Sequence, residues 1–241
     1  EYVNLYKKYG HWKDGGIKLE GNVTNELTYL FLKDYEMNKK TKVEDFSPYF
    51  VTSQIIKNEG YVIPFGDGPE PLYQHRISKT MIMTMLNQAK HYVYMTTPYL
   101  IIDNELVECI KNASLRGIDV RIIVPHIPDK KFIFFMTRSY CRELMDSGVK
   151  IYEYKPGFIH TKSYISDDEV GIVGSMNLDY RSLVHHFENG VYFYHHSVLQ
   201  SIKGDIEKTI QKSIFINEKS IKDTLVQHFI HFFVTIISPL L

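Results

Sequence analysis

Residues 160–177 read HTKSYISDDEVGIVGSMN, and this stretch decides the fold of the chain. Its polar positions form the pattern HxKxxxxDxxxxxxGSxN. The stretches 159–166 and 170–173 flank Asp167-Asp168-Glu169 and are predicted as two short strands joined by a turn. We therefore expect a hairpin that presents polar side chains at one end.

The residue types in this hairpin suit chemistry at a phosphodiester. His160 titrates near neutral pH, so it can attack phosphorus or protonate a departing alkoxide. Lys162 shares the strand face of His160, because positions i and i+2 point the same way. Ser175 and Asn177 repeat that spacing and offer neutral donors to charge that develops on phosphate oxygens. Taken singly, each residue is most often structural or solvated, but their joint spacing favours a site. We predict His160 and Lys162 as catalytic, and Lys162, Ser175 and Asn177 as phosphate-binding.

Asp167 is the fixed aspartate of the pattern, and we group it with the catalytic residues. Aspartate is also common in turns between strands. We therefore interpret it more as structural support for the hairpin than as a chemical group.

The pattern resembles the HKD motif of the phospholipase D superfamily. That resemblance implies a phosphodiester bond that is cut and remade through a phosphohistidine, with no metal or other cofactor. Most enzymes of the family carry two copies of the motif, whereas this chain has one. An acidic residue that follows the motif orients a catalytic histidine in the superfamily, and Glu188 matches its place. The resemblance thus implies that Glu188 orients His160.

A weak internal repeat connects the start of the chain with its end. Residues 11–17 (HWKDGGI) are similar to residues 185–191 (HHFENGV), and a predicted helix follows each, over 22–32 and 197–214. Asp14 is then the counterpart of Glu188 and would orient the histidine of a first motif. We infer that the chain is the C-terminal part of a longer enzyme whose first motif lies upstream.

The resemblance extends over nearly the whole chain to bacterial cardiolipin synthases. The matching segments occur in the same order and are residues 9–14, 97–103, 116–121, 148–154, 177–182 and 238–241. It implies a phosphatidyltransferase that condenses two phosphatidylglycerols to cardiolipin and glycerol. The implied partners are phosphatidylglycerol, a membrane surface and the missing half with the first motif. The implied location is the cytoplasmic face of a bacterial cell membrane.

Composition limits the choice of substrate. The 241 residues include 28 basic and 28 acidic side chains, and this neutral balance disfavours nucleic acid as a partner. Cys109 and Cys141 lack the spacing of a metal site or disulfide framework, and we place Cys109 in the core. No apolar run is long enough to span a membrane. The apolar segment 225–237 either lies in a bilayer interface or docks on the core as a helix.

Alternating strands and helices predict an α/β sandwich with a mixed, largely parallel sheet flanked by helices. We divide the chain into the end of a first phospholipase D-like half (1–35), a linker (36–58), a second such domain with the motif (59–216) and an apolar tail (217–241). Strands are predicted at 17–19, 61–65, 92–96, 118–124 and 149–154. Helices are predicted at 72–89 and 104–115, and a third follows the loop 125–130 and ends near residue 146. His126, Lys130, Lys131 and Arg138 follow a strand end, where sites form, although solvated charge is the more ordinary role of the two lysines.

Other functions fit a single motif. A homodimer in which each chain donates one motif would be a phosphodiesterase, such as a nuclease or a phospholipase D-type hydrolase. A third interpretation is an inactive fragment that keeps the fold and part of the site.

Overall fold

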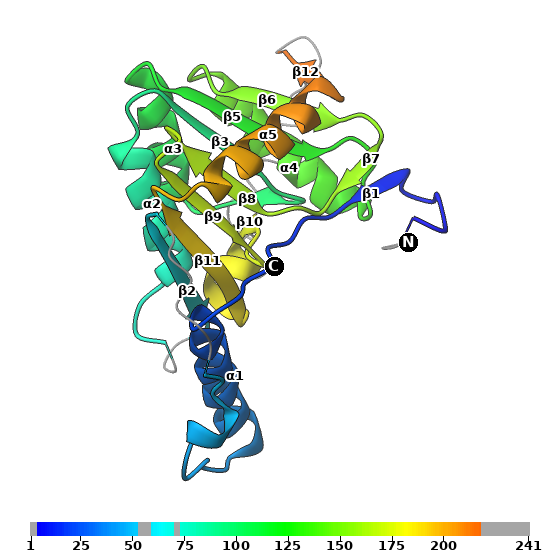
Figure 1. The fold of residues 1–241 in the computed structure, drawn as a ribbon. Helices are drawn as coiled ribbons and strands as arrows, with labels where there is room; N and C mark the ends of the chain where they lie inside the picture. The colour runs from blue at the N-terminus through cyan, green and yellow to red at the C-terminus, as the bar shows by residue number, and fades with distance from the viewer. Residues whose placement is uncertain (1–3, 53–58, 70–72, 218–241) are drawn as a thin grey trace.

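A computed structural model of the chain describes residues 4–52, 59–69 and 73–217. The predicted apolar tail from residue 218 onward and part of the predicted linker lie outside the described residues. Figure 1 shows a central sheet with helices on both faces and one long helix that projects beyond the end of the sheet.

The main sheet has eight strands in the order β12-β6-β5-β3-β8-β9-β11-β2. Their bounds are β2 (Tyr61–Asp67), β3 (Tyr92–Thr96), β5 (Asp119–Pro125), β6 (Lys150–Tyr154), β8 (Ser163–Ser166), β9 (Val170–Gly174), β11 (Glu188–Tyr194) and β12 (Ser213–Ile216). The mixed sheet flanked by helices is confirmed, but its pairing is mostly antiparallel. Only β3–β5 and β5–β6 are parallel, because a helix crosses over between those strands, whereas hairpins join β8 to β9.

Two short parallel pairs lie outside the main sheet. One joins β1 (His11–Lys13) to β7 (Gly157–Ile159), and the other joins β4 (Leu100–Ile101) to β10 (Leu178–Asp179). We expected a strand at residues 17–19, but the strand of this segment is β1. Ile17 and Leu19 instead pack beside the core.

The helices are α1 (Val23–Lys39), α2 (Ile77–Gln88), α3 (Asn104–Leu115), α4 (Lys131–Met145) and α5 (Val198–Gln211). Two short helical turns are also present, a 3-10 turn (Ser47–Tyr49) and a π-helical turn, η2 (Arg181–His185). The predicted helix over 104–115 matches α3, whereas α1 continues into the predicted linker. Helix α1 ends where Lys40 takes a left-handed conformation, with φ of 52°.

Side chains alternate between the two faces of the sheet. Val93 and Met95 of β3 pack into the cluster that also contains α2, α3 and α4. Tyr94 between them points into the cluster formed with α5. Both cysteines, Cys109 and Cys141, are buried in the first cluster, as we predicted for Cys109. The motif hairpin β8–β9 therefore sits at the middle of a sheet that is covered on both faces.

Within the described residues, no helix has the length and apolar character needed to cross a membrane.

Candidate active site

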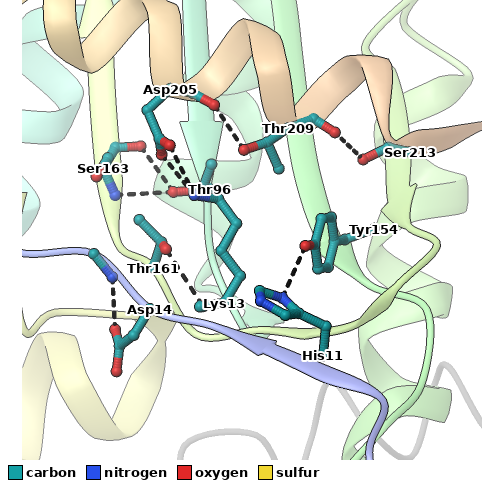
Figure 2. Close-up of polar contacts among 11 residues, drawn as sticks. His11, Lys13, Asp14, Thr96, Tyr154, Thr161, Ser163, Asp205, Thr209 and Ser213 are labelled. Carbon is teal, nitrogen blue, oxygen red and sulfur yellow. Dashed lines mark hydrogen bonds and ion pairs between the residues drawn. The ribbon is translucent and has the colours of Figure 1, made fainter. Parts of the chain in front are cut away.

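The site begins where β1 lies beside β7, the strand that leads into the motif. Trp12 pairs with Phe158 and Lys13 with Ile159 in parallel register. The pairing continues past the strand, since the His160 backbone N–H donates to the Lys13 carbonyl at 2.6 Å. Figure 2 shows this amino-terminal segment held against the domain, with His11 bonded to the Tyr154 hydroxyl at 3.0 Å. Asp14 and His160 are the next residues along the β1–β7 pair, so Asp14 lies beside His160.

The carboxylate beside His160 belongs to Asp14. Its Oδ2 lies 3.0 Å from Nδ1 of His160, and the His160 side chain is about one-third exposed at 32%. We expected Glu188 in this position and expected Asp14 to face the histidine of a first motif, but the structure places Asp14 beside His160. The physical reason is the β1–β7 pairing, which brings Asp14 across 146 residues of chain. A contact of this kind is not visible in local sequence.

Burial and neighbouring charges set the titration of this pair. Burial and then the Lys162 cation lower the pKa of His160, while Asp14 acts in the opposite direction. For Asp14, burial alone would raise the pKa, but bonds from His160 and from the Gly15 N–H lower it overall. Asp14 is thus held as the anion that stabilises a protonated His160.

Aromatic rings form the wall on which His160 rests. The Trp12 ring centroid lies 5.3 Å from that of His160, and the Phe158 centroid lies 6.2 Å away. Trp12 is itself buried and packs on Phe158 at 4.4 Å. This apolar contact explains the desolvation that lowers the pKa of the imidazole.

Lys162 lies at the same end of the hairpin as His160. Its side chain is buried, with a relative exposure of 7%, and burial lowers its pKa to about 8. Three carboxylates, those of Asp14, Glu188 and Asp179, draw the pKa back upward. Its ammonium makes no ion pair within the described part of the chain, although three carboxylates surround it. A buried ammonium of this kind is suited to meet an anion.

Glu188, at the start of β11, is bound by two serine hydroxyls. Ser175 donates to its Oε2, and Ser182 donates to its Oε1 at 2.6 Å. Burial raises the pKa of Glu188, and these hydroxyls oppose the rise. His186 Nδ1 lies 3.9 Å from Oε1. The carboxylate therefore belongs to the group of charges around Lys162, and its hydrogen-bond partners are serines and not His160.

Asn177 is brought to the cluster through Asp179. Its Nδ2 donates to Oδ2 of Asp179 at 3.0 Å, and its buried Oδ1 has no hydrogen-bond partner. Asp179 also accepts from the Ser182 N–H at 2.7 Å, and burial raises its pKa. Sequence reasoning missed Asp179 and Ser182. The available signal was the strand spacing of 175 and 177, which continues to 179.

Asp167 occupies the far end of the motif hairpin. The five residue steps from Lys162 to Asp167 span roughly 16 Å if the chain is extended at about 3.3 Å per step. Its carboxylate accepts backbone N–H bonds from Lys90, His91 and Tyr92 at 2.7, 3.0 and 2.8 Å. It also has a left-handed φ of 54°. Asp167 thus fixes the turn to the start of β3, in line with the structural role we favoured, and its grouping with the catalytic residues stays a prediction.

The loop after β5 has a structural arrangement of its own. Glu153 is buried and accepts from Arg138 Nε at 2.9 Å, while its other oxygen lies 2.7 Å from His126 Nδ1. Two of the four residues that we noted after this strand end, His126 and Arg138, therefore bind a carboxylate. Lys130 and Lys131 are exposed.

No group of three or more His, Cys, Asp or Glu side chains gathers as a metal site in the part of the chain that the structure describes.

Comparison with known proteins identifies the family. A family model described as the cardiolipin synthase, PLD-like domain matches residues 82–210. A cardiolipin synthase of Listeria welshimeri is 33% identical over 213 residues, which cover 88% of this chain and 44% of that protein. An uncharacterized protein of Streptococcus mutans is 41% identical over 244 residues, which cover all of this chain and 52% of the relative. The chain thus spans about half the length of the curated relatives it matches.

A solved structure has the same fold. The phospholipase D family member Nuc of Salmonella typhimurium superposes with a TM-score of 0.55 at 16% sequence identity, over 66% of this chain and all of the other. The agreement of the family model, the relatives and the fold shows that the chain belongs to the cardiolipin synthase family of phospholipase D-like proteins.

Proposed function

We propose that the chain supplies one half of a phosphatidyltransferase site that condenses two phosphatidylglycerols to cardiolipin and glycerol. The observation that carries the proposal is the buried Lys162 ammonium beside the Asp14–His160 pair. A phosphodiester needs a cation for its non-bridging oxygens and an imidazole for proton transfer. Both groups lie here at one end of the motif hairpin, with Ser175 and Asn177 nearby as neutral polar groups.

The second half of the site comes, in this proposal, from another HKD motif. The repeat between residues 11–17 and 185–191 gives the argument, because Asp14 and Glu188 are counterparts. Asp14 pairs with a histidine far away in sequence. By the same geometry, Glu188 would orient the histidine of the other motif. We propose that this motif corresponds to the part of the longer relatives that the chain does not cover.

The reaction then follows in two displacements. A histidine of the other motif attacks phosphorus, and the bond from phosphorus to the departing glycerol oxygen breaks as His160 gives that oxygen its proton. The primary hydroxyl of a second phosphatidylglycerol next attacks the phosphohistidine, and His160 takes the hydroxyl proton. The histidine leaves unchanged and cardiolipin forms. General acid–base help of this kind contributes about 10²- to 10⁴-fold in rate.

Electrostatics support this role for His160. Its pKa lies below the usual value because of burial and Lys162. An anionic phosphodiester bound at Lys162 would offset that cation and raise the pKa toward neutrality. The protonated acid is thereby favoured when substrate arrives. Because Nδ1 faces Asp14, Nε2 is the nitrogen we propose for proton transfer.

The proposal places the protein at the surface of a bacterial cell membrane, where its lipid substrate resides, on the cytoplasmic face. The balance of 28 basic and 28 acidic residues gives no general attraction for a nucleic-acid backbone.

A chimera tests the function. The part of the Listeria welshimeri cardiolipin synthase that this chain does not match is placed before the chain, and lipids are separated after incubation with phosphatidylglycerol. We expect cardiolipin from the chimera, little from the 241-residue chain alone, and loss of product with His160→Ala. Unchanged cardiolipin output from His160→Ala would refute the role of this histidine. Phosphatidic acid as the main product would indicate a hydrolase instead, and robust cardiolipin synthesis by a dimer of the chain alone would refute the need for a second half.

A further inference from the structure

A small cavity opens beside the proposed site, next to Asp179. Its volume is about 70 Å³, and it is lined by Tyr99, Ile101, Lys130, Ile133, Asp179, Tyr180 and Arg181. The shared residue Asp179 also belongs to the carboxylates around Lys162. Because about 10 to 15 Å³ of such volume holds one water molecule, the cavity has room for a few waters or a small head group but not for an acyl chain.

Two cations border this cavity from different parts of the fold. Lys130 comes from the residue before α4, and Arg181 comes from the π-helical turn η2. The Arg181 Nε donates to Nε2 of His186 at 2.6 Å, which anchors the guanidinium. In the described residues, no carboxylate forms an ion pair with either cation. Two cations of this kind at one cavity favour an anionic ligand.

The remaining lining consists of the Asp179 carboxylate, two tyrosines and two isoleucines. Ile101 and Ile133 provide aliphatic surface, and the Tyr99 hydroxyl is bound to Asp129 at 2.6 Å. The Lys130 ammonium lies 5.9 Å from the Tyr99 ring centroid. The cavity thus combines positive charge with apolar contact, which suits an anionic group carried on an apolar molecule.

We propose that this cavity binds the phosphoglycerol head group of the acceptor lipid, with its phosphate between Lys130 and Arg181. The assignment rests on the proposed function and names the place of its second substrate. Three carbons separate the acceptor phosphate oxygen from the reactive primary hydroxyl. A phosphate held by the two cations therefore lets the hydroxyl extend past Asp179 toward Lys162 and His160. The first phosphodiester occupies the Lys162 position, so the two anions are kept apart.

Binding to the 241-residue chain tests the assignment. Soluble dihexanoyl-phosphatidylglycerol, sn-glycerol 3-phosphate and tungstate are titrated separately, and binding is followed by calorimetry and by amide NMR shifts. We expect Lys130→Ala combined with Arg181→Ala to weaken the short-chain lipid about tenfold or more, because two charge-assisted contacts are lost. Tungstate affinity, which reports the Lys162 position, should stay the same and also shows that the variant is folded. The matched control is Lys131→Ala, an exposed neighbour that does not line the cavity.

The outcomes separate this inference from the proposed function. Loss of tungstate binding in Lys162→Ala supports the proposed active site. If the lipid affinity of the Lys130→Ala, Arg181→Ala double variant is nevertheless unchanged, the cavity assignment is overturned. An equal effect of Lys131→Ala also overturns it, since the contribution would be general charge. Equal affinity for sn-glycerol 3-phosphate and the short-chain lipid would overturn the assignment to a lipid and would indicate that the cavity binds a soluble phosphate ester. The single variant Lys130→Ala, at an exposed position, should show a smaller loss of lipid affinity, and no loss counts against the proposal.

Discussion

Asp14 and Glu188 sit in similar stretches of sequence, yet the fold gives them different neighbours. Asp14 has a side chain that is 52% exposed, its pKa is lowered overall, and it faces His160 at 3.0 Å. Glu188 is buried, its pKa is raised, and it is held by the hydroxyls of Ser175 and Ser182. We propose from this difference that each carboxylate of the repeat orients the histidine of the other motif, as Asp14 is placed to do for His160. On that view one half of the site is assembled in this chain, and Glu188 marks the place of the other half.

The largest expected effect comes from neutralising the two carboxylates in turn. In the chimera, Asp14→Asn and Glu188→Gln should each lower kcat by about 10²- to 10⁴-fold, because each removes the group that orients a histidine. In the 241-residue chain, Asp14→Asn should lower the pKa of His160 further and Glu188→Gln should not, since Asp14 and, to a smaller extent, Asp129 raise this pKa whereas Glu188 is not among the groups that shift it. NMR titration of the histidine ring protons measures this. An equal shift of His160 by Glu188→Gln would break the comparison.

Much of this region could be predicted from sequence. The hairpin follows from the alternation around Asp167 and the polar ends of its strands, and β3 and α3 match their predicted ranges. Such features depend on local patterns with periods of two or about four residues. The turn position of Asp167 also follows from local chemistry, whereas the bonds that it accepts from Lys90, His91 and Tyr92 join segments 75 to 77 residues apart and could not be predicted.

What sequence could not supply is the pairing of distant segments. The Asp14–His160 contact depends on β1 lying parallel to β7, and three-residue strands give almost no periodic signal. The direction of the sheet strands was misjudged for a related reason. Alternation of helices with strands indicated parallel pairing, but the consecutive hairpin strands around the motif impose antiparallel neighbours.

A second test concerns Lys162, which lies between the two carboxylates. Its pKa of about 8 is below the ordinary lysine value of 10.5, so the folded state disfavours the protonated form. This penalty is fully present below pH 8 and is relieved as the pH rises from 8 toward 10.5. Lys162→Met should therefore raise the free energy of unfolding at pH 7 by up to about 3 kcal/mol, at about 1.36 kcal/mol per pKa unit, while it abolishes tungstate binding.

Urea denaturation of wild type and Lys162→Met at several pH values checks this prediction. The gain in stability should shrink as the pH is raised through 8 to 10, where the wild-type lysine loses its proton in the folded state. Exposed Lys131→Met provides the control and should show neither effect. If Lys162→Met is destabilised, the attraction between the ammonium and the three carboxylates must exceed the free-energy cost of burying the ammonium.

A smaller effect is expected from the hydroxyls that hold Glu188. Ser182→Ala should cost about 1 to 2 kcal/mol at neutral pH, because a buried carboxylate loses one donor. Ser175→Ala should cost less, since Ser175 is exposed and water can replace it. Both changes should raise the pKa of Glu188 further and leave that of His160 unchanged. Because protonated Glu188 needs these donors less, the stability loss should decrease as the pH falls through the Glu188 pKa. Denaturation curves at several pH values measure the loss, and a pH-independent loss would contradict this account.

The smallest expected effect sharpens what holds Asp14 in place. Lys13 pairs with Asp205 of α5 at 2.8 Å, and Figure 2 shows this contact above the segment that leads to Asp14. Asp205 is half exposed, so the pair should contribute only about 0.2 to 1 kcal/mol in a double-mutant cycle of Lys13→Met and Asp205→Asn. The backbone register needs no side chain from Lys13, because its carbonyl accepts the His160 N–H. The pKa of His160 should therefore stay close to the wild-type value in both variants. A large shift would show that the ion pair with α5, and not the β1–β7 backbone pairing, sets the position of Asp14.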